Sequence, residues 1–173
     1  MAPTVRLPCT ACVGGINTAL AALQAGASLR STEAAVKRET LVVDALKAGA
    51  KVDAVLKKGA RAKAFGALNF EGATPFLLAA RNADLPMMKL LVELGADPHK
   101  PNADDSTPLM AAAGLGCYAP SEEAGTEDEC VAACEYLLSL GADVNAVDKK
   151  NQTAMHGTAY KSLPKVAKLL ASK

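Results

Sequence analysis

The chain contains few aromatic residues and few histidines, and both shortages restrict what it can do. Its 173 residues include 3% aromatic residues, no Trp and two His. A core with so few rings has to be built from Ala, Leu, Val and Met. The two imidazoles, His99 and His156, lie far apart in the sequence. They predict neither a catalytic triad nor a histidine metal cluster.

Sequence motifs of catalysis are also missing. The chain has no GxSxG nucleophile turn, no GxxxxGK[ST] phosphate-binding loop and no HExxH metalloprotease helix. Each of these patterns places a reactive group or a phosphate cradle at a fixed point of a fold. We therefore expect no enzyme activity, no catalytic residue, no bound metal and no cofactor.

Long apolar runs and an excess of one charge are missing too. No run approaches the ~20 apolar residues that a membrane-spanning helix needs, so membrane insertion is not expected. A formal net charge of +1 gives no general attraction to nucleic acid.

The first residues carry one early Arg and no dense apolar segment, so no secretory signal is expected. The chain has five cysteines, an odd number. We therefore expect the protein to reside in the cytoplasm or another reducing soluble compartment.

One phrase occurs three times: GATPFLLAA from Gly72, STPLMAAAG from Ser106 and QTAMHGTAY from Gln152. The helical patterns after the first two copies end in LGAD, at 94–97 and 140–143. This combination resembles the ankyrin-repeat family, whose unit is a pair of helices with a Thr-Pro-Leu-His-x-Ala phrase and a period of about 33 residues. The copies also resemble a bacterial variety of ankyrin protein, in which GATPFLLAA, TPLMAAAG and a GTE-type insertion occur together.

The residue types of the phrase have mechanical reasons. Thr74 and Thr107 can cap the first helix of a unit, and a Pro after each occupies a position where the missing N–H costs nothing. Gly95 and Gly141 suit the left-handed residue that ends a second helix. Small residues let the first helices of neighbouring units stack closely. These are Ala79, Ala80, Ala112 and Ala113.

The spacing predicts two enlarged loops. Thr107 follows Thr74 by 33 residues, whereas Thr153 follows Thr107 by 46, and the glycines at 49, 95 and 141 are also 46 apart. We expect an all-α solenoid of about four helix-turn-helix units at 16–50, 71–104, 105–150 and 151–173, with enlarged loops at about 51–70 and 114–126. The first unit is divergent and contains a long helix at 33–48, and residues 1–15 are expected to be irregular. The last unit is expected to have a polar outer face, made by Lys161, Lys165, Lys168 and Lys173.

The resemblance implies a protein-protein interaction module that presents a rigid groove and its turn tips to a protein partner. The family's contact positions fall on the solvent-facing side of the first helices and on the turns. In this sequence they are Leu78, Arg81, Asn82, His99, Lys100, Asn102, Asp104, Met110, Ala111, Asp148, Lys149, Lys150, Gly157, Tyr160 and Lys161.

The two insertions suggest an alternative, a structural accessory subunit held in a larger assembly. Residues 47–63 carry six basic residues and one acid, and Phe65 and Phe70 follow as possible apolar anchors. The same stretch also fits a solvated loop whose phenylalanines pack on the solenoid. The acidic insertion is largely accounted for by a capping box, in which Thr126 and Glu129 start a helix.

The cysteines leave a third hypothesis open. Cys9 and Cys12 form a lone CxxC, which could serve a redox or metal role although no second CxxC completes a zinc site. Cys130 and Cys134 lie on one helical face and are expected to be small core residues, and a disulfide between Cys117 and Cys130 is an alternative.

Overall fold

The computed structural model describes residues 32–47, 49–57, 68–117 and 125–173. Seven helices lie in these segments, and the described residues contain no strand. The helices are α2 (Thr32–Lys47), α3 (Pro75–Arg81), α4 (Leu85–Glu93), α5 (Pro108–Ala112), α6 (Glu127–Ser139), α7 (Ala154–Lys161) and α8 (Pro164–Ala171). The predicted all-α fold is confirmed.

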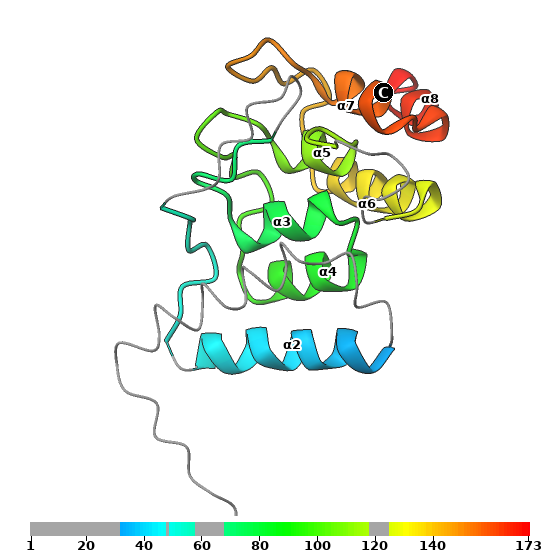
Figure 1. Ribbon diagram of the computed structural model, residues 1–173. Helices are drawn as coiled ribbons and strands as arrows, with labels where there is room; N and C mark the ends of the chain where they lie inside the picture. The colour runs from blue at the N-terminus through cyan, green and yellow to red at the C-terminus, as the bar shows by residue number, and fades with distance from the viewer. Residues whose placement is uncertain (1–31, 48, 58–67, 118–124) are drawn as a thin grey trace, which may run out of the picture.

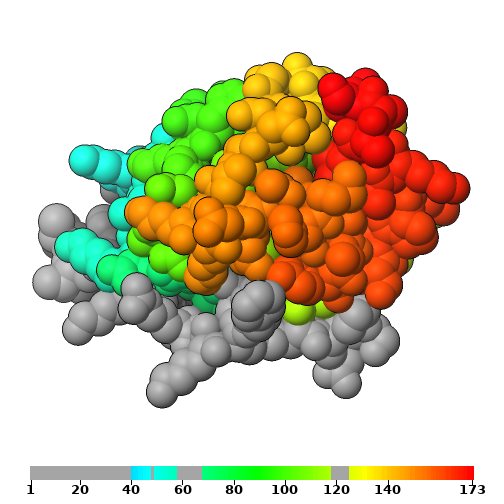
Figure 2. Space-filling view, turned by 90° about the horizontal axis from the view of Figure 1, so that it is seen from above, coloured from blue at the N-terminus to red at the C-terminus, as the bar shows by residue number. Residues whose placement is uncertain are grey.

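The helices from α3 onward form two parallel rows (Figure 1). In one row α3 packs against α5 and α5 against α7, and in the other α4 packs against α6 and α6 against α8. Each helix of the first row also contacts its own partner of the second row. The stack is therefore a solenoid of helix pairs, and Figure 2 shows α7 and α8 at one end of it, beside the turn that precedes α7.

The first helices start as the phrase predicts. Thr74 Oγ1 accepts a hydrogen bond from the N–H of the third helical residue at 3.1 Å, and Thr107 Oγ1 does the same at 3.3 Å. The predicted capping box at α6 is also present. Glu129 N donates to Thr126 Oγ1 at 3.3 Å, and Thr126 N donates to Glu129 Oε2 at 2.6 Å.

The ends of the helices use left-handed residues. Gly95 and Gly141 follow α4 and α6 with φ of 89° each, as predicted. A second left-handed position follows each first helix, and it is occupied by Ala83, Gly116 and Ser162 with φ of 53°, 89° and 57°. A side chain at Gly116 would place its Cβ 2.5 Å from Leu68 Cβ, so only glycine fits there.

The core is built from small and aliphatic residues. Ala79, Ala80, Ala112 and Ala113, which stack α3 on α5, are each at most 1% exposed. The second helices present one buried position three times, as Met87, Ala133 and Val166, each at most 1% exposed. The expectation of small residues at the stacking face is confirmed.

The N-terminal unit is described only in part. The helix predicted at 33–48 is present as α2, and its Val42 is buried in the same core. Residues 1–31, which include the segment predicted to be irregular as well as Cys9 and Cys12, lie outside the described residues. Residues 58–67 and 118–124, with Phe65, lie outside them too.

The last unit has a mostly polar outer end. Lys165, Lys168 and Lys173 are exposed, as expected, but Lys161 is buried. None of the described helices has the length and apolar character that crossing a membrane requires.

Candidate protein-binding surface

In each outward turn of the stack, an Asn or Asp side chain at one recurring position accepts hydrogen bonds from the backbone of the turn. Asn102 Oδ1 accepts hydrogen bonds from the N–H groups of Asp104 and Ser106 at 3.0 and 2.8 Å. Asp148 Oδ1 accepts from the N–H groups two and four residues further on at 2.8 and 2.9 Å. Asn69 begins the same pattern, with one such bond at 3.0 Å. The three side chains fix the shape of three successive turns.

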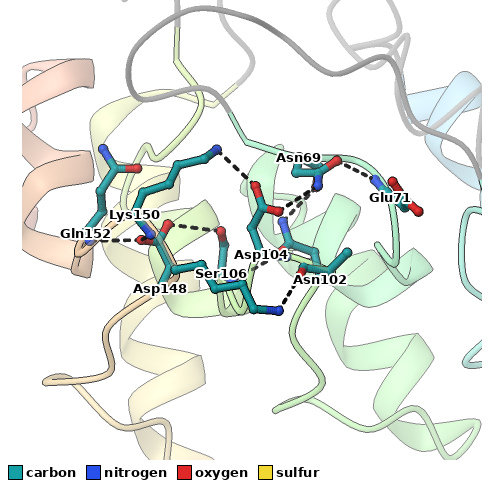
Figure 3. A network of polar contacts seen from close by, with 10 residues as sticks. Asn69, Glu71, Asn102, Asp104, Ser106, Asp148, Lys150 and Gln152 are labelled. Carbon is teal, nitrogen blue, oxygen red and sulfur yellow. Dashed lines mark hydrogen bonds and ion pairs between the residues drawn. The ribbon is translucent and has the colours of Figure 1, made fainter.

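The same side chains join each turn to the next (Figure 3). Asn102 Nδ2 donates to the backbone carbonyl of Asn69 at 2.7 Å, and Asn69 Nδ2 donates to Asp104 Oδ1 at 2.9 Å. Ser106 Oγ donates to Asp148 Oδ2 at 3.2 Å. A continuous polar ladder thus runs across three units.

Backbone hydrogen bonds reinforce this ladder. Ala103 N donates to the carbonyl of Glu71, and Lys149 N donates to the carbonyl of Asp104, both at 2.9 Å. The turns are therefore fixed relative to one another by main chain as well as by side chains.

These contacts correct two predicted partner-binding residues. Asn102 and Asp148 are 4% and 5% exposed, so the expectation that they are free turn-tip contacts is wrong. Their polar atoms satisfy the backbone donors of the turns, which a buried turn requires.

Five residues that were expected on a solvent-facing side of the first helices are buried instead. Leu78, Met110 and Ala111 are each 1% exposed, and Lys161 is 6% exposed. Gly157 is buried, with its Cα against the backbone of the preceding unit. Each first helix contacts a neighbouring unit as well as its own second helix, so these positions face protein rather than solvent.

The remaining predicted contact residues are accessible. His99, Lys149 and Lys150 are exposed. The half-buried ones are Arg81, Asn82, Lys100, Asp104 and Tyr160. Their role in binding stays a prediction.

The lysines of the turns also contact the neighbouring turn. Lys100 Nζ donates to the carbonyl of Asp53 at 3.3 Å, and Lys149 Nζ donates to that of Ala103 at 2.7 Å. Lys150 Nζ lies 3.1 Å from Asp104 Oδ2. These ammonium groups are held in defined positions at the edge of the stack.

Two further accessible residues are oriented by intramolecular contacts. The Arg81 guanidinium lies over the ring of Phe70 at 5.5 Å from its centre, and Phe70 packs against the core. This supports the interpretation of Phe70 as a residue that packs on the solenoid. Tyr160 Oη accepts from Gln152 Nε2 at 2.8 Å.

The turns also carry a row of exposed apolar residues that was not predicted. Val55 and Val147 are 43% and 55% exposed, and Pro101 is exposed as well. Each is the sixth residue after the glycine of its turn, at 49, 95 and 141. Aligning the turns on these glycines would have revealed the row, which we call the tip row.

The described cysteines form no disulfide with one another: Cys117 is half-buried, and Cys130 and Cys134 are buried. The alternative of a disulfide between Cys117 and Cys130 is therefore not realised. Burial raises the pKa of the Cys134 thiol to about 12, so this thiol stays protonated and serves as a core residue. Within the described segments, no cluster of three or more His, Cys, Asp or Glu could hold a metal ion.

Comparison with known proteins agrees with this architecture. A family model described as ankyrin repeats (3 copies) matches residues 78–173, more than half of the chain. The chain belongs to the ankyrin-repeat family. In ankyrin terms, His156 takes the place of the histidine of the phrase, and its Nδ1 accepts from Thr153 N at 3.1 Å, which braces the start of α7 as the family pattern implies.

Ankyrin proteins of mammals are among the similar sequences. Ankyrin repeat and SOCS box protein 10 of mouse is 36% identical over 59 residues, which cover 34% of this chain and 13% of that protein. Its human counterpart is 38% identical over 55 residues, covering 32% and 12%. Ankyrin repeat and SAM domain-containing protein 6 of rat is 37% identical over 87 residues, covering 50% and 8%. The chain thus spans a small part of these relatives, and the resemblance to bacterial ankyrin proteins stays an expectation.

Proposed function

We propose that this ankyrin domain is a non-catalytic adaptor that binds a protein partner through its turn tips and the adjoining ends of its first helices. The observation that carries the proposal is the tip row, Val55, Pro101 and Val147, which sets an exposed apolar residue at the same position of three turns. Ankyrin repeats are a protein-protein interaction fold. Three equivalent exposed apolar residues on it favour contact with another protein over a solvated edge.

The rigidity of the turns supports this function. Asn69, Asn102 and Asp148 fix the turn backbones, and the lysines at 100 and 149 are already held against the preceding turn. A preformed surface loses little conformational entropy on binding, so more of the contact energy appears as affinity.

The accessible polar residues would form the rim of the contact. Arg81 and Tyr160 are the best anchors, because each is partly buried, oriented by a neighbour and of a residue type enriched among binding hot spots. The turns carry both lysines and aspartates, which fits a protein surface of mixed charge better than a nucleic acid.

Affinity capture from the native source tests the proposal, with the intact chain as bait and mass spectrometry of the recovered proteins. The test variant is the double substitution Val55→Glu and Val147→Glu. Its matched control is Leu94→Glu, because Leu94 is an exposed apolar residue, 38% exposed, at the end of α4. We expect the double variant to lose the partner and the control to retain it. Equal recovery with both folded variants would refute a contact through the tip row.

A second pair of variants separates the adaptor from the accessory subunit. Deletion of residues 58–66 shortens the basic insertion while retaining Leu56, whose N–H and carbonyl pair with Ala73 and Gly72. An adaptor is expected to keep its partner after this deletion and to lose it on replacing Arg81 and Tyr160 with Ala. The opposite result, together with a stoichiometric complex that resists salt, would support the accessory subunit.

A further inference from the structure

Lys161 is a buried lysine that the repeat architecture does not require. It ends α7 and is 6% exposed. The residue 46 positions earlier, at the same place in the preceding unit, is Leu115, which is 1% exposed. The stem of the lysine passes over Gly114, where a side-chain Cβ would lie 2.6 Å from Lys161 Cβ. The glycine leaves the space that this lysine occupies.

The ammonium group of Lys161 reaches a cysteine of another unit. Lys161 Nζ donates to Cys130 Sγ at 3.5 Å. Cys130 is 0% exposed and lies in the first turns of α6, the second helix of the preceding unit. A lysine nitrogen, which becomes nucleophilic once it loses a proton, and an oxidisable sulfur thus meet between two repeats.

The environment of Cys130 makes its thiol slow to react with an oxidant, and it limits which groups can reach the oxidised sulfur. Burial raises the pKa of the Cys130 thiol above its ordinary value of 9.0, and Lys161 opposes that rise. Reaction with an oxidant is therefore slow. A sulfenic acid formed at this position would be enclosed, with the amine of Lys161 beside its sulfur and bulk thiols excluded.

We propose that Cys130 and Lys161 form a peroxide-driven covalent cross-link between the third and fourth units. Hydrogen peroxide oxidises the thiol to a sulfenic acid and is itself reduced to water. The Lys161 amine, after losing a proton to water, attacks the sulfur, and hydroxide leaves as a second water once it takes up a proton. The product is an S–N bond, a sulfenamide, of the kind that sulfenic acids form with protein nitrogen.

Cys134 competes poorly for the same sulfenic acid. Residues four apart on a helix have Cβ atoms about 5–6 Å apart, whereas a disulfide requires about 3.5–4.5 Å. A bond from Cys130 to Cys134 would therefore unwind α6, and a bond to Lys161 would not.

The test uses a full-length variant that keeps Cys130 as its one cysteine. The other cysteines are replaced by Cys9→Ser, Cys12→Ser, Cys117→Ser and Cys134→Ala, and circular dichroism checks the fold. After exposure to hydrogen peroxide, the intact mass is expected to fall by about 2 Da, because two hydrogens are lost without gain of oxygen. Trypsin is expected to stop cleaving after Lys161, and the peptides with Cys130 and Lys161 are expected to be linked until a thiol reductant separates them.

Matched controls are Lys161→Arg and Cys130→Ala in the same background, and neither should form the linked peptide. The proposal is overturned if Cys130 gains about 32 Da as a sulfinic acid while cleavage after Lys161 continues. It is also overturned if Cys130 of the folded chain stays reduced even after prolonged exposure to hydrogen peroxide, or if the link forms only after denaturation.

Discussion

Ser106 and Asp148 join two units through one short contact, in which the Ser106 hydroxyl donates to Asp148 Oδ2 at 3.2 Å. The other oxygen of the same carboxylate holds the backbone of its own turn. One buried side chain thus shapes a turn and fastens it to the previous one. This double use makes the ladder of turn residues a part of the fold's stability.

Asn102 is expected to be a major stabilising residue. Asn102→Ala removes two bonds accepted from backbone N–H groups and one donated to Asn69, all of them in a buried turn. We expect the free energy of unfolding to fall by about 2–4 kcal/mol, since buried donors are left without partners. Urea denaturation followed by circular dichroism measures it. His99→Ala, at an exposed turn residue, is the control and should change stability by less than about 0.5 kcal/mol.

The left-handed position after the first helices predicts substitutions of opposite sign. Ser162→Gly is expected to stabilise the chain by about 1 kcal/mol, because glycine adopts a φ of 57° without the steric cost of a side chain. Gly116→Ala is expected to destabilise it by about 2 kcal/mol or more, because the new Cβ meets Leu68 at 2.5 Å. Thermal unfolding of both variants tests the pair. A gain on Gly116→Ala would contradict the close approach.

Stability is expected to fall at alkaline pH through Cys134. The pKa of this thiol is raised from 9.0 to about 12 by burial, so the folded state holds a proton that the unfolded state releases. The stabilisation is complete below pH 9 and is lost as the pH rises from 9 toward 12. At pH 10.5 the loss from this one group amounts to about 2 kcal/mol. The measurement is the difference in unfolding free energy between pH 8 and pH 10.5 for wild type and Cys134→Ala, and equal differences would contradict it.

Gln152 and Tyr160 are expected to show non-additive substitution effects. Gln152 Nε2 donates to Tyr160 Oη, while Gln152 Oε1 is buried and has no hydrogen-bond partner among the described residues. Tyr160→Phe should cost about 1–2 kcal/mol, because it leaves the amide without its acceptor. Adding Gln152→Met removes both unsatisfied atoms and should restore most of that loss. A double-mutant cycle measures the coupling, and purely additive effects would contradict the pairing.

The repeat phrase allowed much of the fold to be predicted, because its features act locally. Caps at Thr74, Thr107 and Thr126, left-handed glycines at 95 and 141, and small residues at the stacking face depend on a few neighbouring positions. Their physical roles therefore follow from residue type and spacing alone.

The contact surface was predicted less well, because exposure depends on how units stack. The resemblance implied that Leu78 and Met110 face solvent, yet both are 1% exposed. Asn102 and Asp148 are residue types that usually occur in exposed turns. Only their hydrogen bonds in the structure show that they hold the turn backbone. The tip row was within reach of the sequence, since Val55, Pro101 and Val147 share one offset from their glycines.

The backbone bonds between successive turns have a consequence for selectivity. Because Ala103 N donates to the carbonyl of Glu71 and Lys149 N to that of Asp104, main-chain hydrogen bonds help to set the distance between neighbouring tips. Substitutions at the tips can change the chemistry of contact and leave the interval unchanged. The spacing of the turns therefore restricts what can bind across them: any segment that touches two tips must carry its own contact groups at the matching interval.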